Sequence, residues 1–109
     1  MESLLNEILT DLTTELGLTE SSDIAVLKSK IKNSIREVKR TRNYLSHQTE
    51  EFIWKDMEKY YSNIRELALY DYNQVGAEGQ LTMNENGVSR NWKDRKECFM
   101  GIVPFVSGI

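Results

Sequence analysis

The sequence predicts a mainly α-helical fold: a small antiparallel helical bundle that carries a short β-hairpin or extended arm and an extended C-terminal tail. Three observations predict it. Apolar residues recur at three- and four-residue steps in three segments of the first two-thirds of the chain, which is the spacing of a buried helical face. Short polar connections separate these segments, as in antiparallel bundles. The helical spacing is lost after Gly76.

The length of 109 residues gives room for one domain with one modest core. A chain of this size buries only a little more than about 60% of the surface that its unfolded form exposes. We expect the bundle to occupy residues 1–78, and the arm and tail to occupy residues 79–109 of the same domain.

The first two helices are expected over about residues 2–16 and 21–44. Gly17 is suited to end the first, because glycine adopts the left-handed conformation without a clash at Cβ. Ser21 or Ser22 can accept hydrogen bonds from the free amides that begin the second. The predicted buried stripes are Leu4, Leu5, Ile8, Leu9, Leu12 and Leu16 in the first helix, and Ile24, Leu27, Ile31, Ile35, Val38 and Leu45 in the second.

A third and longer helix is expected over about residues 49–75. Thr49 followed by two glutamates is typical of a helix start, and the glycines of Gly76-Ala77-Glu78-Gly79 predict its end. Its length and its aromatic content make it the expected central packing element. Its stripe comprises Ile53, Met57, Tyr60, Tyr61, Ile64, Leu67, Ala68 and Val75.

The rest of the chain is expected to be irregular. Asn86-Gly87 is a strong hairpin-turn signal because both residues tolerate positive φ, so residues 80–92 are predicted to form a short β-hairpin or extended arm. Residues 93–99 are expected to form one or two helical turns, and an apolar, extended tail follows.

Charge is segregated along the chain, although the net charge is only −3. Residues 1–23 carry six acidic groups and no basic group, residues 24–47 carry seven basic groups and one acidic group, and residues 48–109 carry seven basic and ten acidic groups. An acidic block followed by a basic block makes a dipolar molecule. Such a molecule can neutralise itself internally or pair head-to-tail with copies of itself.

The sequence contains no pattern typical of an enzyme. His47 is the single histidine, so one chain cannot form a His-paired metal site, and we expect it in a solvated break between helices. The single cysteine, Cys98, excludes an internal disulfide, which suits a reducing cytoplasm, and is expected to pack as a small apolar residue. Gly76-x-x-Gly79 lacks the lysine and the strand-to-helix setting of a phosphate-binding loop. We predict no catalytic activity, no metal and no cofactor.

Two charged features have competing interpretations. The carboxylate pairs Glu50–Glu51 and Asp56–Glu58 are expected at a helix start or on solvent-facing surfaces, where they would be ordinary solvating charges. The second helix carries a basic face that would contact phosphates in a salt-dependent way, or would be a solvated or protein-facing surface that complements the acidic first helix. The residues of this face are Lys28, Lys32, Arg36, Lys39, Arg40 and Arg42.

The apolar tail is the feature that a monomer explains least well. Soluble proteins seldom expose several large apolar residues together, so the tail is expected either to fold back on the bundle or to dock on another subunit. Pro104 would interrupt a strand ladder formed with a partner. The tail residues are Gly101, Ile102, Val103, Pro104, Phe105 and Val106.

Two runs of sequence resemble the head–tail connector (adaptor) proteins of tailed bacteriophages. They are residues 69–79, LYDYNQVGAEG, and residues 85–90, ENGVSR. In that family a late helix typically runs into a Tyr-Asn…Gly-Ala-Glu-Gly turn and then a Gly-Val-Ser segment. The size, the helical N-terminal two-thirds and the extended C-terminal portion are also similar, whereas the first 20 residues match least well.

The resemblance implies a virion protein of the head–tail interface that is present in the host bacterial cytoplasm before assembly. It implies a ring beneath the portal, commonly dodecameric, that extends the channel through which DNA passes without sequence-specific recognition. The tail would engage the portal protein. An arm would form the interface to a neighbouring subunit or to a tail-completion or head-closure protein, through Gly76, Gly79, Asn86, Gly87, Val88 and Arg90.

The leading hypothesis is therefore a structural connector of a phage or prophage virion. A small nucleic-acid-binding or regulatory protein that uses the basic helix 28–42 is the alternative, and an enzyme that uses Cys98 is a third. We expect no membrane partner, because the longest apolar stretch, residues 99–106, is far shorter than the roughly 20 residues that cross a bilayer.

Overall fold

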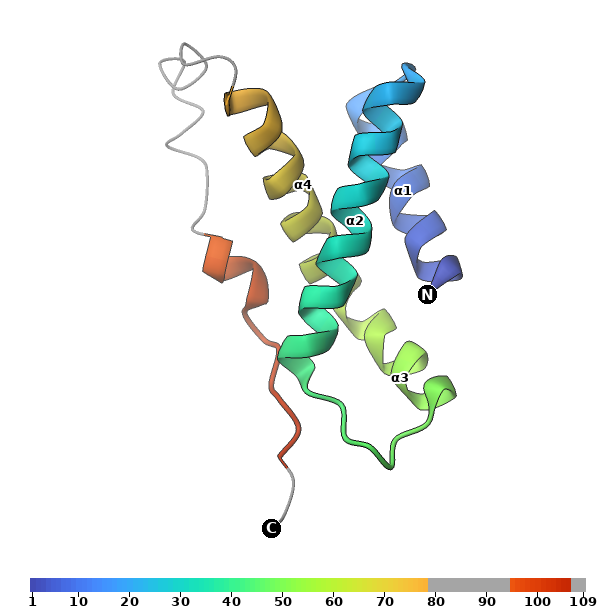
Figure 1. The fold of residues 1–109 in the computed structure, drawn as a ribbon, viewed down its shortest axis with the longest axis vertical. Coiled ribbons are helices and arrows are strands. Elements are labelled where there is room, and N and C mark those ends of the chain that lie inside the picture. Colours follow the sequence, from blue (N-terminus) through green and yellow to red (C-terminus); the bar gives the residue numbers. More distant parts are fainter. Residues whose placement is uncertain (79–94, 107–109) are drawn as a thin grey trace.

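A computed structural model describes residues 1–78 and 95–106 and is mainly helical, as predicted (Figure 1). The elements are α1 (Glu2–Leu16), α2 (Ser21–Arg42), α3 (Glu50–Met57), the 3-10 turn η1 (Glu58–Tyr60), α4 (Tyr61–Glu78) and the 3-10 turn η3 (Arg95–Phe99). Helices α1, α2 and α4 run up, down and up in Figure 1 and pack on one another as a three-helix bundle. Within the described part of the chain there is no strand, and no helix is long and apolar enough to span a bilayer.

The first two helices lie close to their predicted bounds. The predicted cap of α2 is not formed, because Glu20 occupies the N-cap position and no side chain caps the helix. Gly17 ends α1 with φ 68°, as expected of a left-handed cap. Asn43 ends α2 two residues before the predicted position, with φ 58°, a conformation that asparagine adopts more readily than most residues. The buried stripe residues are Leu4, Leu5, Ile8 and Leu12 in α1, and Leu27, Ile31, Ile35 and Val38 in α2.

The predicted third helix is two helices joined by a 3-10 turn, so the prediction of one continuous helix is wrong. Its start is confirmed, because Thr49 Oγ1 accepts a hydrogen bond of 3.1 Å from the Phe52 amide. A 3-10 turn brings residues i and i+3 above one another, and Met57 and Tyr60, which have this separation, are both buried at the turn. The apolar stripe therefore continues across the interruption.

The end of the third segment falls within the run Gly76-Ala77-Glu78-Gly79 that predicted it, three residues beyond Val75. Gly76 itself does not terminate the helix, since α4 continues through it to Glu78. A glycine inside a helix costs only about 1 kcal/mol relative to alanine, which the packing of a long helix can offset. The predicted hairpin over residues 80–92 lies outside the described residues.

The core is completed from the C-terminal side of the chain. η3, which confirms the predicted helical turn within residues 93–99, packs on α4 and places Cys98 in the core at 2% exposure. The Asn63 side-chain amide donates hydrogen bonds to the carbonyls of Cys98 (2.8 Å) and Met100 (2.9 Å). These bonds hold the chain against α4 where the tail begins.

Candidate interaction surfaces

The tail folds back on the C-terminal end of α2. This is one of the two arrangements that were predicted for it. The Phe105 amide donates to the Arg42 carbonyl (2.8 Å), and the Asn43 side-chain amide donates to the Phe105 carbonyl (2.9 Å). Arg42 Nη1 donates to the Val103 carbonyl at 2.5 Å. The backbone of residues 103–105 is thus held by polar groups of the helix end.

One side of the tail is used within the chain. The Phe105 ring lies 5.6 Å from the Tyr44 ring and 6.1 Å from the Phe52 ring, measured between centroids, and the Arg42 guanidinium carbon is 3.9 Å from its centroid. Ile102 is 9% exposed and belongs to the core. Two of the tail residues that were expected to dock on a partner are therefore occupied by the chain's own bundle.

The other side of the tail is open. Met100, Val103 and Val106 are 72%, 65% and 69% exposed, and we call these three residues the outer row. Gly101, at φ 90°, takes the left-handed conformation at the turn between Met100 and Ile102. Ile102 and Phe105 face the bundle, while the three residues of the outer row face solvent. The tail therefore carries apolar side chains on both its inner and its outer face.

A buried aspartate lies beneath the tail. Asp56 is 3% exposed and accepts hydrogen bonds from Arg42 Nε (2.9 Å) and the Tyr44 hydroxyl (2.6 Å), and Lys59 Nζ lies 3.1 Å from it. Burial alone would raise the pKa of Asp56, but the hydrogen bonds from Arg42, Tyr44 and Lys59 outweigh it and lower the pKa to about 2. The prediction that Asp56 is a solvated surface charge is wrong.

Arg42 is consequently not part of a free basic face, as it was predicted to be. Its side chain is 14% exposed, and it joins three parts of the molecule: α2, Asp56 of α3 and the tail. Its hydrogen bond to Asp56, reinforced by the carboxylate charge, raises its pKa. Burial and the same carboxylate raise the pKa of Tyr44.

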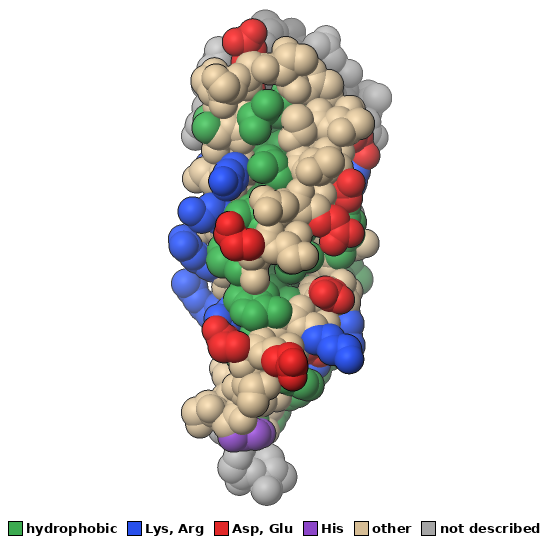
Figure 2. Space-filling view, turned by 90° about the vertical axis from the view of Figure 1, so that its right-hand side faces the viewer, with side chains coloured by type: hydrophobic (Ala, Val, Ile, Leu, Met, Phe, Trp, Pro, Cys, Tyr) green, Lys and Arg blue, Asp and Glu red, His purple; other side chains and the backbone are tan. Residues whose placement is uncertain are grey.

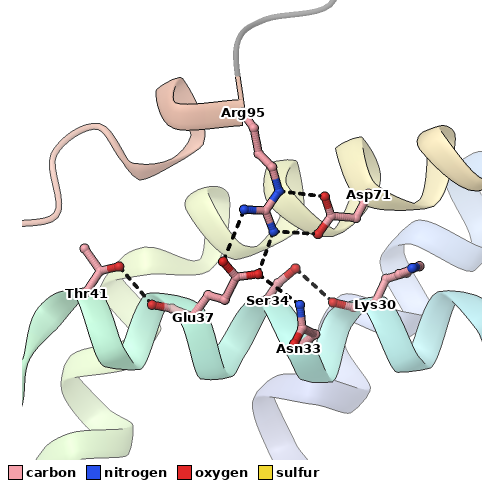
Figure 3. A network of polar contacts seen from close by, with 7 residues as sticks. All are labelled: Lys30, Asn33, Ser34, Glu37, Thr41, Asp71 and Arg95. Carbon is pink, nitrogen blue, oxygen red and sulfur yellow. Dashed lines mark hydrogen bonds and ion pairs between the residues drawn. The ribbon is translucent and has the colours of Figure 1, made fainter.

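A second ionic cluster joins the re-entering chain to the bundle (Figure 3). Arg95 of η3 donates two hydrogen bonds of 2.9 Å to Asp71 of α4, and two more to Glu37 of α2, at 2.5 and 3.2 Å. Asn33 donates to the same Glu37 carboxylate at 2.9 Å. The bonds to Asp71 and Glu37 raise the pKa of Arg95.

This cluster fixes the place at which the described chain resumes after residues 79–94. α4 ends at Glu78, and Arg95, the first described residue after that gap, bonds to Asp71 on the same helix. Of the predicted arm residues, Gly76 lies in the backbone of α4. The others, Gly79, Asn86, Gly87, Val88 and Arg90, lie outside the described residues.

The other residues of the predicted basic face follow one another along α2. We call Lys28, Lys32, Arg36, Lys39 and Arg40 the basic face. Figure 2 shows a column of Lys and Arg side chains along the left edge of the face it draws, where α2 lies. Over residues 1–78 and 95–106, none of these five side chains forms an ion pair, and Lys39 Nζ lies 5.1 Å from the Trp54 ring centroid.

Two acidic residues of α1, Asp11 and Glu15, contact α4. Asp11 accepts a hydrogen bond from the Tyr61 hydroxyl, and Glu15 forms an ion pair with Arg65. Burial, followed by the hydrogen bond to Asp11, raises the pKa of Tyr61 to about 12. Among the described residues, no ion pair joins α1 to the basic face, so the predicted complementarity between the first and second helices is not formed there.

The candidate catalytic residues occupy separate environments. His47 is exposed in the turn between α2 and α3, and Cys98 is packed in the core, in agreement with their predicted positions. In the part of the chain that the structure describes, no group of three or more His, Cys, Asp or Glu residues could hold a metal ion.

Sequence reasoning missed the two residues that organise these surfaces, Asp56 and Arg95. The position of Asp56 three residues after Ile53 and directly before Met57 places it inside the apolar stripe, which is a signal for a buried charge with a partner. For Arg95 the local sequence offers no equivalent signal, because its partners lie 24 and 58 positions away.

Comparison of the chain with family models, curated proteins and solved structures finds no match.

Proposed function

We propose that the chain is a structural connector of a phage or prophage virion, which assembles as a ring under the portal and joins head to tail around the DNA channel. The resemblance over residues 69–79 and 85–90 suggests this class of protein. The mainly helical bundle is compatible with it. The proposed mechanism is geometric: the ring seals the conduit and offers a platform to the next component.

The observation that carries the proposal is the outer row. Met100, Val103 and Val106 expose three large apolar side chains within seven residues. Their backbone is held by side chains of α2 and α4, so docking them on a partner orders little additional chain. Exposed apolar groups on a held backbone are typical of an interaction site, and we assign the row to the portal protein.

The anchoring of Arg95 supports the second interface. Because Arg95 is held by Asp71 and Glu37, an arm formed by residues 79–94 would rejoin the bundle at a fixed place. We propose that it contacts a neighbouring subunit of the ring or the tail-completion protein.

The test is to mix the purified protein with portal rings of the same phage or prophage and image the complexes by electron microscopy. The double variant Val103→Asp/Val106→Asp should no longer decorate the portal, and its circular dichroism should stay that of the wild type. Val26→Asp is the matched control, since Val26 is a 38% exposed apolar residue of α2 outside the tail. Equal decoration by the double variant and the wild type would reject the docking role of the outer row.

A further inference from the structure

The basic face of α2 has a regular geometry. Lys28, Lys32, Arg36 and Arg40 follow one another at four-residue steps, and Lys39 lies beside them. With a rise of 1.5 Å per residue, the column extends over about 18 Å of helix surface. Lys28, Arg36 and Arg40 are exposed and the other two are half-buried.

The charge on this face is not neutralised by the described part of the chain. Two nearby carboxylates are used elsewhere, since Glu37 binds Arg95 and Asp56 binds Arg42. Two shallow hollows open along the column, and both include Arg36 in their lining: one lies towards Lys28 and Lys32, and the other towards Lys39 and Arg40. The column is thus an accessible row of cations with concave places between them.

The net charge of −3 does not remove this local field. At physiological ionic strength the Debye length is about 8 Å, so exposed charges farther away than this are largely screened. Figure 2 shows many of the acidic side chains along the right side of the same face, away from the basic column, and others close beside that column. A polyanion on α2 would therefore meet the cations of the column first, and its binding would be weakened by the acidic groups beside them.

A second copy of the chain is a weaker partner for this face. The acidic helix α1 offers the obvious complement, but its Asp11 and Glu15 are already bound to Tyr61 and Arg65 of α4. Pairing them with another copy would break these contacts. A polyanion that carries one charge per phosphate requires no such exchange.

We propose that the basic face of α2 binds the phosphate backbone of duplex DNA without reading its sequence. The face presents a row of cations, which contact phosphates without reading sequence, and the side-chain amide of Asn33 beside the column is already donated to Glu37. The inference goes beyond the connector proposal, because it depends on α2 alone and would hold for a chain that never meets a portal.

The test measures the fluorescence anisotropy of a labelled 20-base-pair duplex with the full-length protein over a salt series. A face with five cations should give a slope of log K against log[salt] of about −4, and two duplexes of unrelated sequence should bind equally. Arg36→Gln should weaken binding about threefold and reduce the steepness by about 1. Lys32→Gln/Arg36→Gln should weaken it about tenfold.

Lys55→Gln is the matched control, because Lys55 is an exposed lysine of α3 outside the basic face that forms no ion pair with any described residue. It should bind DNA as the wild type does, and all variants should keep the wild-type circular dichroism. An equal loss of affinity in Lys55→Gln and Arg36→Gln would overturn the proposal. A second result would also overturn it. If the double variant bound DNA as the wild type does but lost self-association in sedimentation, the basic face would be the binding site of a neighbouring copy. Portal decoration is measured separately, so failure here does not touch the connector proposal.

Discussion

At the scale of single residues, Asp56 has the largest consequence for the fold. A carboxylate at 3% exposure is tolerated because Arg42, Tyr44 and Lys59 supply donors to it, and a buried charge without partners would be strongly unfavourable. The aspartate in turn orients Arg42, which bonds to the Val103 carbonyl and faces the Phe105 ring. One side chain therefore links the α2–α3 junction to the tail.

Replacing Asp56 with alanine should lower the free energy of unfolding by about 3 kcal/mol, because the Arg42 guanidinium would remain in the bundle without its carboxylate. Urea denaturation followed by circular dichroism measures the loss. Glu58→Ala, two positions away on an exposed side chain, should change stability by no more than about 0.5 kcal/mol. Similar losses in the two variants would mean that Asp56 contributes only as any surface carboxylate does.

The same carboxylate predicts a dependence of stability on pH. Its folded-state pKa of about 2 lies below the ordinary value of 3.8. The stabilisation is thus fully present above pH 4 and is lost as the pH falls from about 4 towards 2, because the unfolded state then binds the proton first. The total corresponds to roughly 2 kcal/mol.

Urea midpoints measured at pH 5, 4, 3 and 2.5 test this dependence. The wild type should lose more stability over this range than Asp56→Asn, and the difference between the two proteins should grow smaller as the pH falls. A difference that stays constant from pH 5 to pH 2.5 would contradict a lowered pKa for Asp56.

At the scale of elements, the sequence predicted α1 and α2 well because each buries one regular stripe and ends at a residue suited to a left-handed cap, Gly17 or Asn43. The interruption after Met57 could not be predicted, since the apolar spacing runs through it unchanged. The contacts made beside it are tertiary: the partners of Asp56 are Arg42 of α2 and Tyr44 just beyond that helix, 14 and 12 positions earlier.

The candidate surfaces show the same limit. The spacing of the cations alone predicted the basic face, except for Arg42. That Arg42 does not belong to the face follows only from its pairing with the buried Asp56. The tail residues were identified, but which of them face inward could not be read from the sequence. That choice follows from the aromatic contacts of Phe105 with Tyr44 and Phe52, which join residues more than 50 positions apart.

The attachment of η3 gives a prediction at this scale. Arg95→Gln should expose η3 to local opening, because Asp71 and Glu37 would lose the guanidinium that joins them. Arg95 is 36% exposed at its side chain, so the loss of global stability should be only about 1 kcal/mol. Hydrogen exchange should accelerate at residues 95–99 and not in α1.

The double variant Glu37→Gln/Asp71→Asn provides the second arm of that experiment. It removes the two charges that Arg95 neutralises. Adding Arg95→Gln to this double variant should therefore lower the free energy of unfolding by less than adding Arg95→Gln to the wild type does. Full additivity of the three substitutions would show that Arg95 does not join the two helices energetically.

At the scale of the whole molecule, stability and interaction are assigned to different faces of the same tail. Ile102 and Phe105 complete the core and the aromatic cluster, while Met100, Val103 and Val106 face solvent. Deleting residues 101–109 would remove both faces at once and would confuse loss of folding with loss of docking. Point substitutions separate them.

Phe105→Ala should lower the free energy of unfolding by about 2 kcal/mol, less than the 3–5 kcal/mol of a fully buried phenylalanine because the ring is only half-buried. Val103→Asp/Val106→Asp should leave the unfolding midpoint in urea within experimental error, because both side chains are already in water. The opposite order should hold for portal decoration: Phe105→Ala retains it under conditions in which the variant is folded, whereas the double variant loses it. If Phe105→Ala left stability unchanged and abolished decoration, the tail would have to leave the bundle to dock, and the outer row would not be the docking surface.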